Sequence, residues 1–327
     1  MQHLSSLDAG FLHFESPETP MHVGSLMLLE LPAGYAGDYF EDVKALIARR
    51  LHLSPVFERR LATIPLDLAD PIWIDDEPAD LDYHIRRIVL PKPGSRAQLE
   101  RYVGRLHSNL LDRSRPLWEL YVVEGLVTGE VATYFKIHHA GLDGAAGVAL
   151  AGAILDTMAA PAEAAPPPSR ERESAPGAVE LASAAVTNIA SQYVRFVKLL
   201  PNAAKAVVRV ALPAVAGGPV PPPPDPVEWE FAPRAPFSRA VTGQRTFAAR
   251  SMPLANAKRV AKAYGVTLND VVLTLCGGAL RAYLEEYSEL PGKSLIAAVP
   301  VSLRKPGDAS QNNQVTMTLA SLATDVA

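Results

Sequence analysis

Residues 130–150 read EVATYFKIHHAGLDGAAGVAL, and the two adjacent histidines in this stretch decide how the chain is interpreted. The part that ends at the histidines is compatible with a β-strand, in which successive side chains point to opposite faces. Positions 133, 135, 137 and 139 then share one face, and positions 134, 136 and 138 share the other. His139 therefore ends an apolar face at the point where a core or a tunnel begins, whereas His138 points the opposite way.

Hydrophobic periodicity on both sides of this stretch predicts alternating helices and strands. Residues 116–126, PLWELYVVEGL, form a strand and a Gly125 turn, which makes a hairpin with the histidine strand. A helix of small residues, 144–158, follows the Asp-Gly pair, and a helix at 269–287 is capped by Thr267 or Asn269. The other predicted elements are strands at 21–31 and 244–254, helices at 38–51 and 99–110, a buried strand at 294–304, and a last strand within 311–327.

Size and composition indicate a folded chain of about two domains, because 327 residues with 48% hydrophobic side chains can bury sizeable cores. A net charge of −4 gives no general attraction to nucleic acid, and no nucleic-acid motif is present. Cys276 is the single cysteine, so no intrachain disulfide is possible, as suits a reducing compartment. Residues 1–17 lack the pattern of a secretory signal, and no run of 18 apolar residues occurs. We therefore expect a cytoplasmic protein.

The composition changes between Pro161 and Pro236, where 15 of the 29 prolines lie. This change predicts three parts: a lobe at 1–160, a Pro-rich connector at 161–236, and a further part at 237–327. Within the connector, a helical period places four cations on one side, with apolar side chains opposite. Those cations are Arg195, Lys198, Lys205 and Arg209. Such a stretch indicates either a helix packed on the protein with a solvated basic face or a helix that lies on a membrane or lipid-droplet surface.

The histidine pair admits three interpretations. A partly shielded neutral imidazole is suited to take a proton from an alcohol or thiol, which favours His139 as a general base. The plain alternative is a hydrogen-bonded histidine of the core. Joint metal binding is disfavoured, because the two rings point to opposite faces and no third ligand stands at regular spacing, so we expect no metal site.

The motif His138-His139-x-x-x-Asp143-Gly144 matches the HHxxxDG motif of the CoA-dependent acyltransferase superfamily. The flanking text, LDRSRPLWELYVVEGL together with the opening LSSLDAGFLHFESPETPMHVGSL, resembles bacterial wax ester synthase/diacylglycerol acyltransferases. So do DYHIRRIVLPKPG, LNDVVLTLCGGALRAYL and PVSLR, and the resemblance covers nearly all of residues 1–160 and 240–316. It implies an α/β (α+β) two-lobe fold like that of chloramphenicol acetyltransferase, with the second lobe incomplete in this chain.

The resemblance also implies roles for the motif residues. His139 matches the base that deprotonates the acceptor hydroxyl, and His138 matches a supporting histidine. Asp143 matches an aspartate that forms a structural ion pair, for which Arg59 or Arg60 is the expected partner. Gly144 permits a tight turn from strand to helix.

Further positions match the substrate tunnel of the family. Asn269 and Asp270 correspond to its Asn-Asp pair, although a helix cap and a first-turn acid are the plain account of both. Asn312-Asn313 stands where the family commonly has Gly-Asn, so Asn313 keeps the asparagine while the glycine is replaced. The other tunnel candidates belong to the Pro-Leu-Trp-Glu run and are Pro116, Leu117 and Trp118.

The implied activity is transfer of a long-chain acyl group from acyl-CoA to diacylglycerol or a fatty alcohol, which makes triacylglycerol or wax ester. Acyl-CoA is a substrate, and no cofactor is expected. The alternatives are a non-catalytic lipid-binding protein on the same scaffold and a condensation-type domain that uses a carrier-protein thioester. Expected partners are a peripheral membrane or lipid-droplet surface and a separate C-terminal fragment that completes the second lobe.

Overall fold

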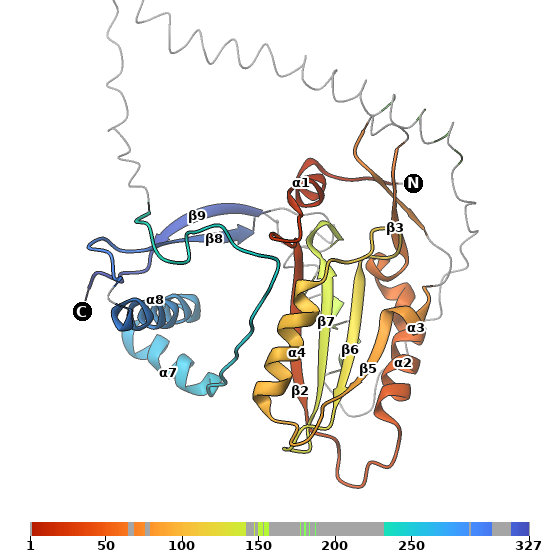
Figure 1. Cartoon of the computed structure of the whole chain (residues 1–327), viewed down its shortest axis with the longest axis horizontal. Helices are drawn as coiled ribbons and strands as arrows, with labels where there is room; N and C mark the ends of the chain where they lie inside the picture. The colour runs from red at the N-terminus through yellow and green to blue at the C-terminus, as the bar shows by residue number, and fades with distance from the viewer. Residues whose placement is uncertain are drawn as a thin grey trace, which may run out of the picture.

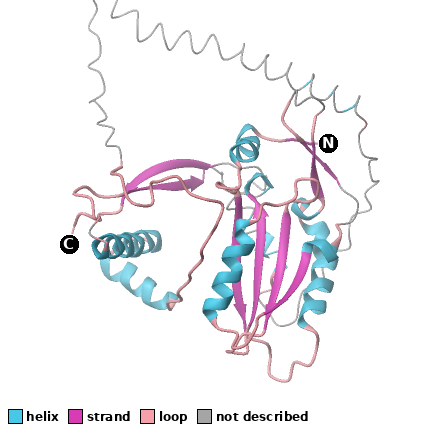
Figure 2. Cartoon of the chain, viewed as in Figure 1, coloured by secondary structure: helices cyan, strands magenta, loops and turns pink. Residues whose placement is uncertain are grey.

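The computed structural model describes most of the chain outside the connector. The described residues are 2–64, 69–75, 79–141, 147, 150–152, 154–156, 177, 180, 183, 187, 232–287, 289–302 and 315–326. Most of the connector lies outside them, so the part boundaries at residues 160 and 236 stay predictions. Figure 1 and Figure 2 show a sheet flanked by helices and, beside it, a smaller group of C-terminal elements.

The main sheet has four strands in the order β2-β7-β6-β5, with β5 parallel to β6 and the other pairs antiparallel. Its strands are β2 (His22–Leu29), β5 (Ile85–Val89), β6 (Trp118–Glu124) and β7 (Val131–His138). The predicted hairpin is confirmed, because β6 and β7 pair antiparallel and the turn between them contains Gly125 with φ 84°. This positive φ is a conformation that glycine adopts without strain.

Two smaller sheets complete the strand structure of the described residues. One has the order β1-β4-β3, built from β1 (Gln2–His3), β3 (Arg59–Ala62) and β4 (Ile72–Asp75). The other is the antiparallel pair β8 (Ile296–Ser302) and β9 (Val315–Ser321). The last predicted strand, within 311–327, is thereby confirmed.

Three of the predicted helices begin where a polar side chain accepts bonds from the first free backbone amides. Asp38 caps the helix predicted at 38–51, Ser95 caps the one predicted at 99–110, and Thr267 caps the one predicted at 269–287. The α-helices are α1 (Ser6–Phe14), α2 (Tyr39–Arg50), α3 (Leu81–His84), α4 (Arg96–Ser108), α7 (Leu254–Tyr264) and α8 (Leu268–Glu286). Short 3-10 turns are η1 (Leu51–Leu53), η2 (Pro55–Phe57) and η4 (His139–Gly141).

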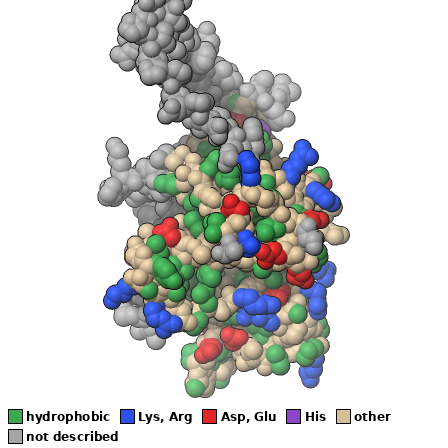
Figure 3. Space-filling view, turned by 90° about the vertical axis from the view of Figure 1, so that its left-hand side faces the viewer, with side chains coloured by type: hydrophobic (Ala, Val, Ile, Leu, Met, Phe, Trp, Pro, Cys, Tyr) green, Lys and Arg blue, Asp and Glu red, His purple; other side chains and the backbone are tan. Residues whose placement is uncertain are grey.

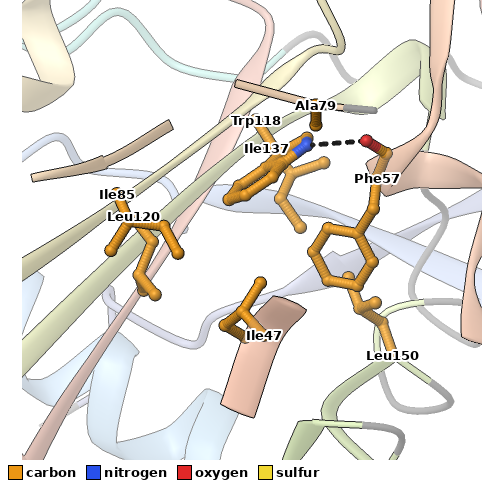
Figure 4. Close-up of a cluster of buried hydrophobic side chains, with 8 residues drawn as sticks. All are labelled: Ile47, Phe57, Ala79, Ile85, Trp118, Leu120, Ile137 and Leu150. Carbon is orange, nitrogen blue, oxygen red and sulfur yellow. Dashed lines mark hydrogen bonds between the residues drawn. The ribbon is translucent and has the colours of Figure 1, made fainter. Parts of the chain in front are cut away.

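The two faces of the main sheet pack against different helices. Ile137 packs with Ile47 of α2 and with Trp118 and Phe57, the group drawn in Figure 4. Tyr134 lies on the opposite face of β7 and packs in a second cluster with residues of α4. The alternation predicted along β7 is therefore confirmed up to His138, where the strand ends. The members of the α4-side cluster are Leu90, Leu99, Val103, Tyr121, Val123, Ala132 and Tyr134.

Several elements, most of them in the C-terminal part, differ from the sequence predictions. Residues 244–254 were expected to form a strand, but residues 244–253 belong to no helix or strand and Leu254 begins α7. Their amides are taken by side chains of α4 instead: Arg245 N–H donates to Ser108 Oγ at 2.9 Å, and Ala249 N–H donates to Glu100 Oε1 at 3.2 Å. The strand at 294–304 forms as β8 (Ile296–Ser302) but is largely half-buried or exposed, because β9 is its one strand partner among the described residues. Helices α1 and α7 were not predicted.

Within the described part of the chain, no single helix has the length and hydropathy to cross a membrane. Helices α7 and α8 together have the length and hydropathy to cross a membrane, but the pair is bent by 104°.

Candidate active site

The histidine pair lies at the end of β7, where both neighbouring strands hold its backbone. His138 N–H donates to the carbonyl of Leu117 at 3.0 Å, and His139 N–H donates to the carbonyl of Met21 at 2.8 Å. Directly after these bonds the chain enters the turn η4, which packs against α1. The sequence places a strand-compatible run before the pair and a small, flexible Ala-Gly after it, so the strand ends where the histidines stand.

His138 is fully buried, and both of its ring nitrogens face defined groups. The N–H of Ala140 donates to its Nδ1 at 3.0 Å, so Nδ1 carries no proton and the neutral ring carries its proton on Nε2. Nε2 lies 3.3 Å from Oε1 of Glu15, which is within ion-pair range but longer than a typical hydrogen bond. His138 is therefore a structural ring rather than one open to substrate.

His139 is half-buried at the start of η4. Its ring stacks on Phe11 of α1, with the ring centroids 4.2 Å apart and the planes 16° from parallel. Phe11 and Ala140 belong to an apolar cluster that also contains Leu12, Leu61, Leu111, Leu117, Leu4 and Trp73. The imidazole is thus neither sealed in the core nor surrounded by bulk water, and an apolar wall lies against one of its faces.

Glu15 is a site residue that the sequence analysis missed. Its carboxylate accepts from Met21 N–H at 3.1 Å and from Arg113 at 2.9 Å, and it faces His138. Burial alone would raise the pKa of this carboxyl, but His138, Arg113 and the Met21 amide together lower it from 4.5 to about 2. Glu15 is consequently ionised. The only signal for it was its place in the opening stretch, since its contact with Arg113 spans 98 positions.

A buried ion pair lies on the same strand face as His138. Lys136 Nζ is 2.8 Å from Glu119 Oε2 and donates to the carbonyls of Leu106 and Asn109 at 3.2 and 2.9 Å, at the end of α4. Burial lowers the pKa of Lys136, and Glu119 counteracts that effect. The pair therefore joins α4 to the sheet beneath the histidines.

The remaining residues of the motif lie partly outside the described chain. Asp143 and Gly144 are outside it, so the ion pair expected for Asp143 stays a prediction. Arg59 contacts Asp75 at 3.2 Å and Gln2 at 2.6 Å, which joins β3 to β4 and to β1. Arg60, the other candidate partner, lies next to it on β3 and is half-buried.

The Pro-Leu-Trp run enters the core close to the histidines. Pro116 and Leu117 are buried, and Leu117 shares the apolar cluster of Ala140. Trp118 has no exposed surface; its Nε1 donates to the carbonyl of Phe57 at 3.3 Å, and its ring stacks on His84 with centroids 4.4 Å apart. This packing gives Trp118 a structural role, and the tunnel role of all three stays a prediction.

Asn269 and Asp270 stand at the start of α8, which Figure 1 draws apart from β7. Asp270 accepts from Thr267 N–H at 2.8 Å and from its hydroxyl at 2.7 Å, so the plain account as part of a capping box holds for Asp270. It also borders a cavity of about 480 Å³ with Thr274, Gly277 and Arg281. Asn313, the last tunnel candidate, lies outside the described residues, and the described contacts do not bring Asn269 or Asp270 to the histidine pair.

No group of three or more His, Cys, Asp or Glu side chains that could hold a metal ion occurs in the described ranges.

Comparison with known proteins gives a consistent family signal. Residues 4–272 match the model of the wax ester synthase/diacylglycerol acyltransferase catalytic domain. A probable diacylglycerol O-acyltransferase of Mycobacterium tuberculosis is 39% identical over 330 residues, which cover 98% of this chain and 68% of that protein. An O-acyltransferase of Acinetobacter baylyi is 35% identical over 326 residues, 99% of this chain and 68% of that protein. The chain thus spans about two thirds of the length of these relatives.

Solved structures agree. The wax ester synthase/diacylglycerol acyltransferase from Marinobacter aquaeolei VT8 matches with a TM-score of 0.65 and 32% identity, over 99% of this chain and 67% of that one. A condensation domain of the calcium-dependent antibiotic synthetase matches with a TM-score of 0.51 and 16% identity, over 98% of this chain and 69% of that one. The second match shows a shared fold alone.

Proposed function

The chain belongs to the wax ester synthase/diacylglycerol acyltransferase family and is an O-acyltransferase, and we propose that His139 is the general base of its reaction. Acyl groups pass to diacylglycerol or a fatty alcohol, in keeping with a similar protein named as a probable diacylglycerol O-acyltransferase and a similar structure named as a wax ester synthase/diacylglycerol acyltransferase. The observation that carries the proposal is the half-buried imidazole of His139 at the end of β7, with Phe11 stacked on one of its faces.

In the proposed step, a ring nitrogen of His139 takes the proton of the acceptor hydroxyl as its oxygen attacks the thioester carbonyl of acyl-CoA. The new C–O bond forms, the C–S bond breaks, and the proton passes to the CoA thiolate. No covalent acyl-enzyme is needed. A base partly shielded from water is suited to this step, because its protonation state then depends on the reacting groups rather than on bulk solvent.

The experiment measures release of free CoA from palmitoyl-CoA with dioleoylglycerol or hexadecanol. His139→Ala is expected to lower kcat by about 10²- to 10⁴-fold, the contribution typical of a general base. His3→Ala, which changes an exposed histidine of β1, is the matched control and should retain wild-type activity. Unchanged turnover in His139→Ala would remove the base proposal, and product on a carrier protein without free CoA would favour condensation chemistry.

We propose in addition that the protein is cytoplasmic and lies peripherally on a membrane or lipid-droplet surface, because its substrates are lipids. The support is the basic stretch of the connector, which lies outside the described residues. Neutral variants at Arg195, Lys198, Lys205 and Arg209 should weaken co-sedimentation with anionic liposomes, and high salt should release the wild type. Binding unchanged in both tests would assign the stretch to packing on the protein.

A further proposal is that another polypeptide, such as a separate C-terminal fragment, covers the outer face of α8. Leu268, Val272, Leu275 and Tyr283 fall within about 80° of one another on a helical wheel and are 38 to 48% exposed. Figure 3, viewed from the side of the C-terminal elements, shows hydrophobic side chains at the surface among charged ones. A native mass measurement that shows a co-purifying fragment supports the proposal, and a bare monomer with this face accessible to solvent contradicts it.

A further inference from the structure

Glu15 is a buried carboxylate with no place in the proposed proton transfer. It is the residue that ends α1, and only 1% of its side chain is exposed. Arg113 binds Oε2 through two nitrogens, at 2.9 and 3.3 Å, and also donates to the carbonyl of Leu12 at 2.7 Å. Arg113 therefore fixes both the carboxylate and the helix end that carries it.

The other carboxylate oxygen, Oε1, contacts two groups next to the histidine pair. Oε1 accepts the N–H of Met21 at 3.1 Å and lies 3.3 Å from Nε2 of His138. Because Nδ1 of His138 accepts the N–H of Ala140, the proton of the neutral ring is on Nε2, the nitrogen that faces Glu15. A negative charge at this place favours that tautomer over the reverse one.

Both groups that Glu15 holds are bonded in turn to the backbone around His139. Met21 uses its N–H for Glu15 and its carbonyl for the N–H of His139, at 2.8 Å. His138 receives the N–H of Ala140, the residue on the other side of His139. The two backbone groups that flank the His139 side chain are therefore both anchored, through one intermediate each, to a single carboxylate.

We propose that Glu15 is a positioning residue for acyl transfer, which together with the N–H of Ala140 fixes the tautomer of His138, and which holds the η4 backbone and thereby orients the His139 ring. The inference rests on the proposed function of His139. Glu15 touches no reacting atom. Rather, it sets the geometry that the base needs, as the partners of catalytic and metal-binding histidines do elsewhere.

A purely structural role for the Glu15–Arg113 ion pair predicts different behaviour. Such a pair would join α1 to the segment before β6, and its loss would lower stability without a specific effect on the imidazoles. The discriminating readouts are therefore the tautomer of His138 and the separation of kcat from KM.

The central test is Glu15→Gln in the full chain, with Glu18→Gln as matched control, since Glu18 is an exposed glutamate three positions away. Nitrogen-15 NMR of histidine side chains should show His138 of the wild type protonated on Nε2 and mixed tautomers in Glu15→Gln. In the CoA-release assay, kcat of Glu15→Gln should fall about tenfold to a hundredfold, with KM for palmitoyl-CoA changed less than about twofold. Glu15→Asp should recover part of kcat, and Glu18→Gln should match the wild type.

Each result decides the inference. A wild-type tautomer of His138 in Glu15→Gln overturns it whether or not kcat falls, as does an altered tautomer with unchanged kcat. If Glu15→Gln does not fold, the wild-type NMR spectrum still tests the proposal, because a proton on Nδ1 of His138 would contradict the role proposed for Glu15. The tautomer of His138 measured by NMR does not depend on the role of His139. A result in His139→Ala that removes the general-base proposal is therefore distinguishable from one that removes the positioning role of Glu15.

Discussion

Lowering the pH should destabilise the protein measurably through one buried histidine, His22. This residue of β2 lies opposite His138 and is 5% exposed. Its Nε2 donates to the carbonyl of His107 at 2.8 Å, and its Nδ1 has no hydrogen-bond partner among the described residues. A second proton would therefore lie on a nitrogen without an acceptor, close to the positive charge of Lys136. Burial lowers the pKa of His22 from 6.5 to about 4, Lys136 and His107 add to that effect, and the bond to the His107 carbonyl and the charge of Glu15 oppose it.

The sign follows from proton linkage. Between pH 6.5 and pH 4 the unfolded state binds a proton at this position that the folded state does not, so the free energy of unfolding falls as the pH falls. With the values 6.5 and about 4, the loss between pH 7.5 and pH 5 is about 2 kcal/mol, and it reaches about 3 kcal/mol near pH 4.

Urea unfolding at a series of pH values between 7.5 and 5 measures this loss. His22→Gln keeps a donor for the His107 carbonyl and removes the titration, so its stability curve should be flatter than that of the wild type by about 2 kcal/mol over this range. His3→Gln, at an exposed histidine, is the control and should follow the wild type. Parallel curves for the wild type and His22→Gln would refute the reasoning.

Three further variants test the packing around the site. Lys136→Met should cost about 3 kcal/mol of stability in urea unfolding, because buried Glu119 loses its nearest cation and keeps the longer contact with Arg86 at 3.4 Å and the Tyr121 hydroxyl at 2.8 Å. Adding Glu119→Leu should recover most of that loss, and a double variant no better than the single one would contradict this explanation. Trp118→Phe keeps an aromatic ring but loses the bond to the Phe57 carbonyl and some packing volume, so a loss of about 1 to 3 kcal/mol is expected, and an unchanged midpoint would speak against it. Ser95→Ala removes the cap of α4 and should cost about 1 kcal/mol, whereas a stability within error of the wild type would show that the cap contributes nothing.

Local patterns predicted the elements that position the histidines. The pattern of residues 131–138 is typical of a strand, and β7 forms there. The turn at Gly125 connects it to β6 in an antiparallel hairpin. The sequence offered Thr267 or Asn269 as the cap of α8, and the structure assigns the cap to Thr267, whose side chain forms a capping box with Asp270 within one turn. These features depend on neighbours in sequence, so the sequence contains them.

Features that depend on distant contacts were missed. Residues 244–254 have the composition of a strand, yet they lie against α4 because Ser108 and Glu100 take their amides. Glu15 gave no local sign of its burial, which arises from Arg113 and His138, far along the chain. Helix α7 has a recognisable stop at Gly265, with φ 66°, but no polar side chain caps its start. The contacts of Asp143 and Asn313 stay predictions, because both lie outside the described residues.

In the proposed reaction, the imidazole of His139 accepts the hydroxyl proton as the ester forms. The most direct test is the single-turnover rate of CoA release from a saturating mixture of palmitoyl-CoA and hexadecanol, compared between the wild type and His139→Ala. If His139 is the general base, the rate should be about 10²- to 10⁴-fold lower in the variant, with its fold intact by circular dichroism. A variant rate within about twofold of the wild-type rate would contradict this role, because the loss of a general base changes the rate far more than that.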